Sequence, residues 1–184
     1  MLTEDDKKKL IEIAKESIAY GLVHNLRLAV DIKHAPAALQ KNRASFVTLN
    51  IGGQLRGCIG TLEAYRPLIE DVSENAYSAA FQDPRFNPVS ESEYEQLEYH
   101  ISILEPAEDF PVTSEEELLQ QLRPGIDGLI LEDGYHRATF LPSVWESLPT
   151  AKAFLHHLKL KAGLPENYWS DTIRFQRYEV EAFS

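Results

Sequence analysis

The single cysteine of this 184-residue chain lies in the glycine-containing stretch LRGCIGT, residues 55–61. Arg56 precedes Cys58 by two positions, and residues two apart on a β-strand share a face, roughly 7 Å from each other. A guanidinium at that distance favours the thiolate, which is the nucleophilic form of cysteine. The stretch therefore predicts a thiol site, with Cys58 as its catalytic residue.

The same residues also fit a purely structural role. Cysteine is among the most buried residue types and packs as a small hydrophobic side chain. Gly57 and Gly60 leave space beside the strand, either for a ligand or for another part of the chain. No base is adjacent to Cys58 in the sequence, so His100 or His136 would have to supply one from another strand, and each also fits an ordinary structural or solvent-facing histidine. Both interpretations stay open.

A second candidate site lies in FQDPRFNP, residues 81–88, where the oppositely charged Asp83 and Arg85 flank Pro84. This segment follows the helix predicted directly after the Cys58 strand, and short connections keep such a loop near its parent sheet. Arg85 is able to bind a carboxylate or phosphate through two hydrogen bonds. The alternative is an internal pair between Asp83 and Arg85, and the sequence does not separate the two.

The histidines form no recognisable metal site. His156 and His157 are adjacent on a predicted helix and point about 100° apart, so they do not bind one ion together. His156 falls opposite the apolar helix face, which predicts a solvated side chain. The sequence has no CxxC, HExxH or acidic calcium loop, and GGQLRG lacks the pattern of a phosphate-binding loop. We predict no metal site, and the sequence identifies no cofactor.

The composition argues against two classes of partner. The chain has 29 acidic and 18 basic residues, a net charge of −11 that repels phosphate backbones. We therefore expect neither nucleic acid nor membrane as a direct partner. A lone cysteine forms no internal disulfide, and neither a signal-peptide core nor a run of about 18 apolar residues is present. These features predict a cytoplasmic protein.

The first half of the chain predicts a helix and a hairpin. Thr3 is suited to cap a helix over residues 4–20, which carries acidic residues in its first turn. Two strand-like runs, 45–51 and 54–60, are joined by Gly52-Gly53, and paired glycines are typical of a tight hairpin turn.

The rest of the chain predicts alternating helices and strands. In the last strand the alternation of apolar and polar positions shifts by one residue near Arg177, which predicts a β-bulge. In chain order these elements are a helix over 66–81 with Pro67 in its first turn, short helices capped by Ser90 and Ser114, a strand over 97–106, a second hairpin with Asp133-Gly134 as its turn pair, a helix from Thr150 to Lys161, and a strand over 172–183. The order indicates an α+β fold of mainly antiparallel hairpins with flanking helices, forming one domain of two lobes over residues 1–184.

Four segments together resemble a known family: LRGCIGT, AAFQDPRFNP, LRPGIDGLILEDG and ATFLPSVWE. The chain is similar over essentially its whole length to AmmeMemoRadiSam system protein A, of the AMMECR domain family, and LRGCIG followed by DPRF is a specific combination. Ser143 departs from the family pattern, which has glutamine there. The resemblance implies a two-lobed domain with the RGCIG strand near a cleft between the lobes. From the genomic context of the family, it also implies association with a radical-SAM protein and a Memo-like protein. It implies no settled activity.

Two hypotheses about function follow. In the first, the protein is an enzyme component that acts with those two partners; in the second, it is a non-catalytic binding or scaffold protein for them. A structural dimer without a ligand is a third alternative. For the first hypothesis the catalytic residue is Cys58, and the candidate substrate-binding residues are Arg56, Gly57, Gly60, Thr61, Asp83, Arg85 and His136.

Overall fold

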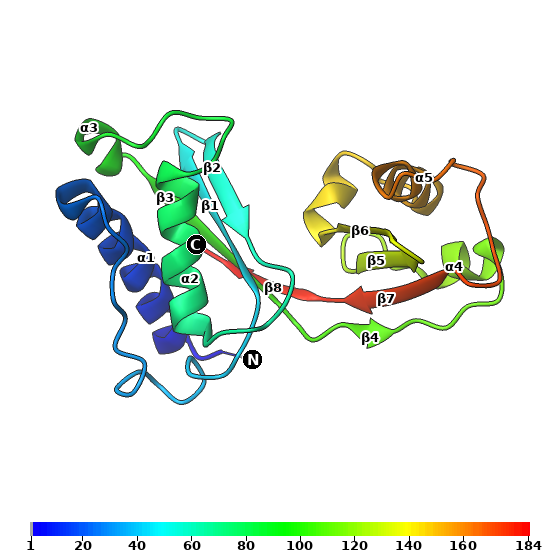
Figure 1. Cartoon of the computed structure of the whole chain (residues 1–184), viewed down its shortest axis with the longest axis horizontal. Helices are drawn as coiled ribbons and strands as arrows, with labels where there is room; N and C mark the ends of the chain where they lie inside the picture. The colour runs from blue at the N-terminus through cyan, green and yellow to red at the C-terminus, as the bar shows by residue number, and fades with distance from the viewer. Residues whose placement is uncertain (1) are drawn as a thin grey trace. The chain divides into compact units, whose positions relative to one another are not determined.

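The computed structural model describes residues 2–184, which form two compact units (Figure 1). The first unit holds the residues up to Leu104 together with Glu181–Ser184, and the second holds Glu105–Val180. The described residues form two four-stranded sheets and two separate apolar cores. The predicted α+β class, with antiparallel strands in hairpins and flanking helices, is confirmed.

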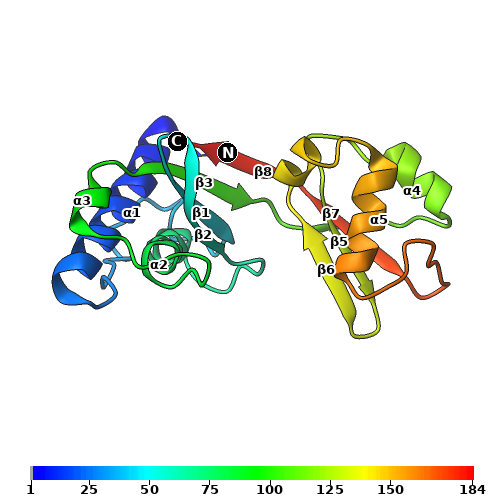
Figure 2. The same cartoon turned by 90° about the horizontal axis from the view of Figure 1, so that it is seen from above.

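The sheet of the first unit has the strand order β2-β1-β3-β8. Its elements are α1 (Glu4–His24), β1 (Ser45–Ile51), β2 (Gln54–Gly60), α2 (Leu68–Phe81), α3 (Glu91–Tyr94), β3 (Glu98–Leu104) and β8 (Val180–Phe183). Helices α1 and α2 lie side by side, and α2 packs on β1 and β2 (Figures 1 and 2). The apolar side chains between the helices and the strands form the first core.

Local chemistry explains both ends of α1. Thr3 and Asp6 form a reciprocal capping box at its start. The helix extends four residues beyond the predicted end at residue 20, and it stops at Asn25, which adopts the left-handed conformation with φ 54°. Pro67 is the cap residue of α2 rather than part of its first turn.

The first hairpin confirms the predicted glycine turn. Gly52 and Gly53 have φ values of 57° and 74°, which only glycine adopts readily. The register of β1 and β2 shifts between Leu49 and Asn50, so one residue of β2 is extra at that point. This bulge decides which side chains meet around Cys58.

The sheet of the second unit has the strand order β4-β7-β5-β6. Its elements are β4 (Glu108–Asp109), α4 (Glu115–Gln121), β5 (Gly128–Asp133), β6 (His136–Phe140), a 3₁₀ helix (Pro142–Glu146), α5 (Ala151–Lys161) and β7 (Arg174–Tyr178). Trp145 stacks on Phe154 of α5 with 3.8 Å between ring centroids, at the centre of the second core.

Two predicted features of this unit are wrong. The turn of the second hairpin is Gly134-Tyr135 rather than Asp133-Gly134, because Asp133 pairs with His136 and only Gly134 has a positive φ. The last strand is not one bulged strand but two, β7 and β8, which belong to different sheets. The change of apolar phase near Arg177 marks this exchange, because the side chains on each part face a different core.

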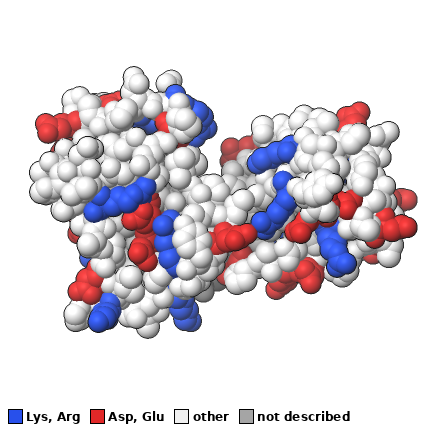
Figure 3. Space-filling view, in the orientation of Figure 1, with Lys and Arg blue, Asp and Glu red and all other residues white. Residues whose placement is uncertain are grey.

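Charge on the molecular surface is mixed, and Figure 3 shows acidic and basic side chains interspersed on one face. Among residues 2–184, the longest helices are too polar or too short to span a bilayer.

Candidate thiol site at Cys58

Cys58 lies on β2, the edge strand of the first sheet, and its side chain is half-buried. Its neighbour Gly57 faces α2, so Cys58 lies on the opposite face of the sheet. Across the sheet Cys58 pairs with Thr48 of β1, which in turn pairs with His100 of β3. The three side chains form a row on that face, and the Cys58 Sγ atom lies 3.1 Å from the Thr48 hydroxyl.

The loop after α2 covers the free edge of β2. The backbone N–H of Cys58 donates to Asp83 Oδ2 at 2.9 Å, and Arg85 Nη2 donates to the Cys58 carbonyl oxygen at 3.4 Å. An uncovered edge strand exposes N–H and C=O groups that pair readily with another chain. The DPRF segment therefore takes the place of a neighbouring strand beside the thiol.

Asp83 and Arg85 also pair with each other. Arg85 Nε and Nη2 donate to the two carboxylate oxygens of Asp83 at 3.0 and 2.8 Å, so the internal pair is present. This bond, helped by the backbone N–H groups of Cys58 and Arg85, holds the pKa of the buried Asp83 carboxyl well below its usual range, against the effect of burial. The Arg85 side chain remains about half exposed (54%).

Arg56 is engaged away from the thiol. Its Nε and Nη2 atoms donate to Glu93 of α3 at 2.8 and 3.0 Å, and Nη2 also donates to the Asn87 carbonyl oxygen. Arg56 is the extra residue of the bulge, since Leu55 pairs with Asn50 while Gly57 pairs with Leu49. The regular alternation that would place Arg56 beside Cys58 therefore does not apply.

Arg85, rather than Arg56, is the arginine that contacts Cys58, because its Nη2 atom donates to the Cys58 carbonyl oxygen. The pKa of Arg85 is raised, first by its hydrogen bond to Asp83 and further by the charge of that carboxylate. The pKa of Glu93 is lowered to about 2, mainly by the hydrogen bond from Arg56. The two arginines of the site thus have separate carboxylate partners.

The two glycines are explained by packing within the protein. A Cβ atom on Gly57 would lie 2.1 Å from the Ala79 carbonyl oxygen of α2. A Cβ atom on Gly60 would lie 2.2 Å from the ring of Phe46. Of the two predicted occupants of this space, a ligand or another part of the chain, the structure shows the second.

Thr61 belongs to a buried polar network centred on Asp71. The Asp71 carboxylate accepts hydrogen bonds from the hydroxyl of Thr61, from the backbone and hydroxyl of Ser45, and from Arg66 Nε at 2.7 Å. These bonds tie the first turns of α2 to the start of β1 and the end of β2. In this structure Thr61 is a structural contact of the sheet.

The histidines lie in different environments. His136 belongs to the second unit, where Nδ1 donates to the Ala162 carbonyl oxygen at 2.8 Å. His100 is half-buried at the end of the Cys58–Thr48 row. The prediction that His156 is solvated is wrong, because its Nε2 atom lies 3.3 Å from Glu115 Oε1 and its side chain is only 23% exposed.

Sequence reasoning missed Thr48 as a neighbour of the thiol. Counting back from the Gly52-Gly53 turn without a bulge pairs Thr48 with Gly57, whereas the shifted register pairs it with Cys58. The bulge has no signal in the local sequence that would have placed it, so only the structure brings these two side chains together.

The comparisons with known proteins decide the family. A family model described as AMMECR1 matches residues 11–183. The chain belongs to the AMMECR1 family. A protein of Methanothermobacter thermautotrophicus is 37% identical over 190 residues, covering 99% of this chain and 95% of that one. A protein of Thermotoga maritima is 38% identical over 179 residues, covering 96% and 95%.

The AMMECR1 fold is also seen in a solved structure. The crystal structure of the uncharacterized protein PH0010 from Pyrococcus horikoshii matches with a TM-score of 0.87 and 30% identity, covering 98% of this chain and 92% of that chain. The AMMECR family predicted from the LRGCIG and DPRF segments is thereby confirmed.

Proposed function

We propose that this AMMECR1 protein is the protein A component of an AmmeMemoRadiSam system, and that its thiol at Cys58 takes part in the reaction. In this proposal the protein acts in the cytoplasm together with a radical-SAM protein and a Memo-like protein. Cys58 serves as the nucleophile, or as an acid in its protonated form.

One observation carries the proposal. The half-exposed Cys58 thiol lies 3.1 Å from the Thr48 hydroxyl, and the Arg85 guanidinium donates a hydrogen bond to the Cys58 backbone carbonyl oxygen. A hydroxyl and a guanidinium next to a sulfur atom both stabilise negative charge on it. Among the described residues, the Nη1 atom of Arg85 makes no hydrogen bond, so it is available to an anionic group of a substrate.

The proposal divides the candidate residues into two groups. Cys58 and Arg85 are the groups that meet a substrate. Support for the thiol-bearing strand comes from Arg56, Gly57, Gly60, Thr61 and Asp83. A substrate contact of His136 stays a prediction.

The test is the rate of alkylation of Cys58 by iodoacetamide in the native protein near neutral pH. We expect the native thiol to react faster than the same thiol in the denatured protein. Arg85→Gln should lower this rate, while Arg56→Gln should leave it unchanged, because Arg56 is the extra residue of the bulge and binds Glu93. Protection of the thiol, or a rate that Arg85→Gln does not lower, contradicts the proposal.

A second candidate function is a non-catalytic binding or scaffold role for the same two partners. It is favoured by the internal pairing of Arg56, Asp83 and Arg85, which leaves few charged groups to act on a substrate. In that case Cys58→Ser retains full function, and substitutions of exposed residues disrupt complexes with the purified partners. Absence of any complex at micromolar concentration rules this role out.

A further inference from the structure

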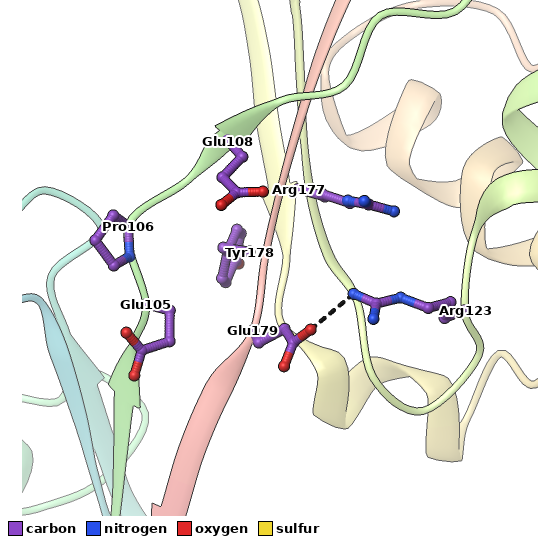
Figure 4. Close-up of a pocket in the computed structure, with 7 residues that line it drawn as sticks. All are labelled: Glu105, Pro106, Glu108, Arg123, Arg177, Tyr178 and Glu179. Atoms are coloured by element: carbon purple, nitrogen blue, oxygen red, sulfur yellow. Dashed lines mark hydrogen bonds and ion pairs between the residues drawn. The ribbon is translucent and has the colours of Figure 1, made fainter. Parts of the chain in front are cut away.

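A pocket of about 380 Å³ lies in the second unit, beside the short strand β4. Figure 4 shows the residues that line it, which are Glu105, Pro106, Glu108, Arg123, Arg177, Tyr178 and Glu179. Its volume is within the range of small-molecule sites, roughly 300–1,000 Å³. A backbone hydrogen bond of 2.9 Å from Glu105 to Glu179 holds two of its walls together.

Arg123 is a fixed part of the wall. Its guanidinium donates to the fully buried Asp127. It also donates to Glu179 at 2.8 Å, as Figure 4 shows. These two carboxylates, Asp127 first, raise its pKa above the usual range. Because its charge is matched by neighbours within the protein, Arg123 does not require a ligand.

Arg177 and Glu108 are different. They are direct cross-strand partners in the β4–β7 pair, a position where opposite charges normally form an ion pair. The Arg177 guanidinium instead stacks on the Phe110 ring, with 4.8 Å to the ring centroid. Among residues 2–184, neither charge has an ion pair or hydrogen bond to another side chain. The Arg177 guanidinium and the Glu108 carboxylate therefore line the same pocket without forming an ion pair with each other.

We propose that this pocket binds a small zwitterion of the α-amino-acid type. The ligand carboxylate accepts two hydrogen bonds from Arg177, as the planar guanidinium favours. The ligand ammonium donates to Glu108, so that the molecule bridges the two unpaired charges. Pro106 supplies apolar surface for the ligand side chain.

The test compares three probes of related carbon skeleton: L-norvaline, which carries both charges, pentanoate, which lacks the ammonium, and butylamine, which lacks the carboxylate. Each is titrated into the full ¹⁵N-labelled chain, and amide chemical shifts are followed. We expect norvaline to shift the amides around β4 and Arg177, and to bind about tenfold more tightly than either singly charged probe. Equal binding of the three probes, or no shift at the pocket with norvaline, overturns the proposal.

Variants identify the two charges. Arg177→Gln and Glu108→Gln should each weaken norvaline binding about tenfold. The matched controls are Arg174→Gln, on the same strand but outside this pocket, and Glu146→Gln, an exposed acid on the 3₁₀ helix, and both should bind like the original protein. Unchanged binding in Arg177→Gln or Glu108→Gln overturns the assignment of that contact.

Two further variants keep the result interpretable. Arg177→Lys retains the charge but not the two-pronged geometry, so it should fold and bind with intermediate affinity even if Arg177→Gln is unstable. Cys58→Ser should bind norvaline unchanged, because the pocket and the thiol belong to different units. Failure of the thiol proposal therefore leaves this one standing, and the reverse also holds.

Discussion

The backbone N–H of Cys58 donates a 2.9 Å hydrogen bond to the carboxylate of Asp83, which lies 25 positions further along the chain. The same carboxylate is buried and receives two hydrogen bonds from the Arg85 guanidinium and one from the Arg85 backbone N–H. The thiol-bearing strand is thus fixed at its outer edge by a side chain rather than by another strand. Whatever Cys58 does, its position depends on this carboxylate.

Substitution of Asp83 should be costly. Asp83→Asn keeps the size of the side chain but removes the charge that Arg85 and the Cys58 N–H bind. We expect the free energy of unfolding, measured by chemical denaturation, to fall by about 3 kcal/mol. Asp31→Asn, at an exposed position, is the matched control and should change it by less than about 0.5 kcal/mol. Equal effects of the two substitutions would show that the hydrogen bond between Asp83 and β2 does not contribute to the free energy of unfolding.

The Arg56–Glu93 pair predicts a specific pH dependence. Glu93 has an ordinary pKa of 4.5, and Arg56 lowers it to about 2 in the folded protein. A carboxyl whose folded pKa is depressed adds stability above its unfolded pKa and loses it as the pH falls through the folded value. The contribution of the pair should therefore be complete above pH 4.5 and decline as the pH approaches about 2.

The measurement is the difference in unfolding free energy between the original protein and Glu93→Gln across this pH range. The difference should be constant near neutral pH and should shrink steadily below pH 4.5. Glu95→Gln, an exposed neighbour just past the end of α3, should give a difference near zero throughout. If the difference in unfolding free energy between the original protein and Glu93→Gln stays constant down to pH 2, the Arg56–Glu93 pair is not its source.

The elements of this protein could be predicted where local chemistry decides them. The cap at Thr3, the glycine turn at Gly52-Gly53 and the cap at Thr150 each depend on neighbouring residues, and each forms as expected. Local pattern was sufficient for the fold class and for the family.

The candidate site could not be predicted to the same degree, because its contacts connect distant residues. The bulge in β2 turns Arg56 towards Glu93, 37 positions away, and moves Thr48 opposite Cys58. The strand exchange at Glu179 depends on which sheet each half joins. Sequence spacing predicted that the Cys58 strand and the Asp83–Arg85 loop lie close together, but the pairings of their side chains are set by tertiary structure.

Gly57 tests the packing explanation for the RGCIG motif. In Gly57→Ala the new Cβ atom would lie 2.1 Å from the Ala79 carbonyl oxygen, and backbone on both sides cannot move aside easily. We expect a loss of about 3 kcal/mol in unfolding free energy. Gly53→Ala, which has a positive φ but open space around it, should cost about 1 kcal/mol. If Gly57→Ala costs no more than Gly53→Ala, close strand–helix packing is not the reason for this glycine.

Lys159 of α5 offers a last test, in the second unit. Its side chain is fully buried, and its Nζ atom donates to Glu115 Oε2 at 2.6 Å and to the Glu166 carbonyl oxygen at 3.2 Å. Glu115 is the only carboxylate in the described chain that forms an ion pair with this ammonium. Glu115→Gln therefore leaves a buried charge without its counter-ion, and removal of one partner from a buried pair costs about 3 kcal/mol or more.

We expect thermal unfolding of Glu115→Gln to occur well below that of the original protein, whereas Glu116→Gln, the exposed neighbour on α4, should unfold at nearly the same temperature. The double variant Glu115→Gln/Lys159→Met should recover part of the loss, because methionine fills the space of lysine without a charge. Recovery would assign the loss to the unpaired ammonium. If the double variant is instead less stable than Glu115→Gln alone, the apolar stem of Lys159 and its bond to Glu166 matter more than the charge pair.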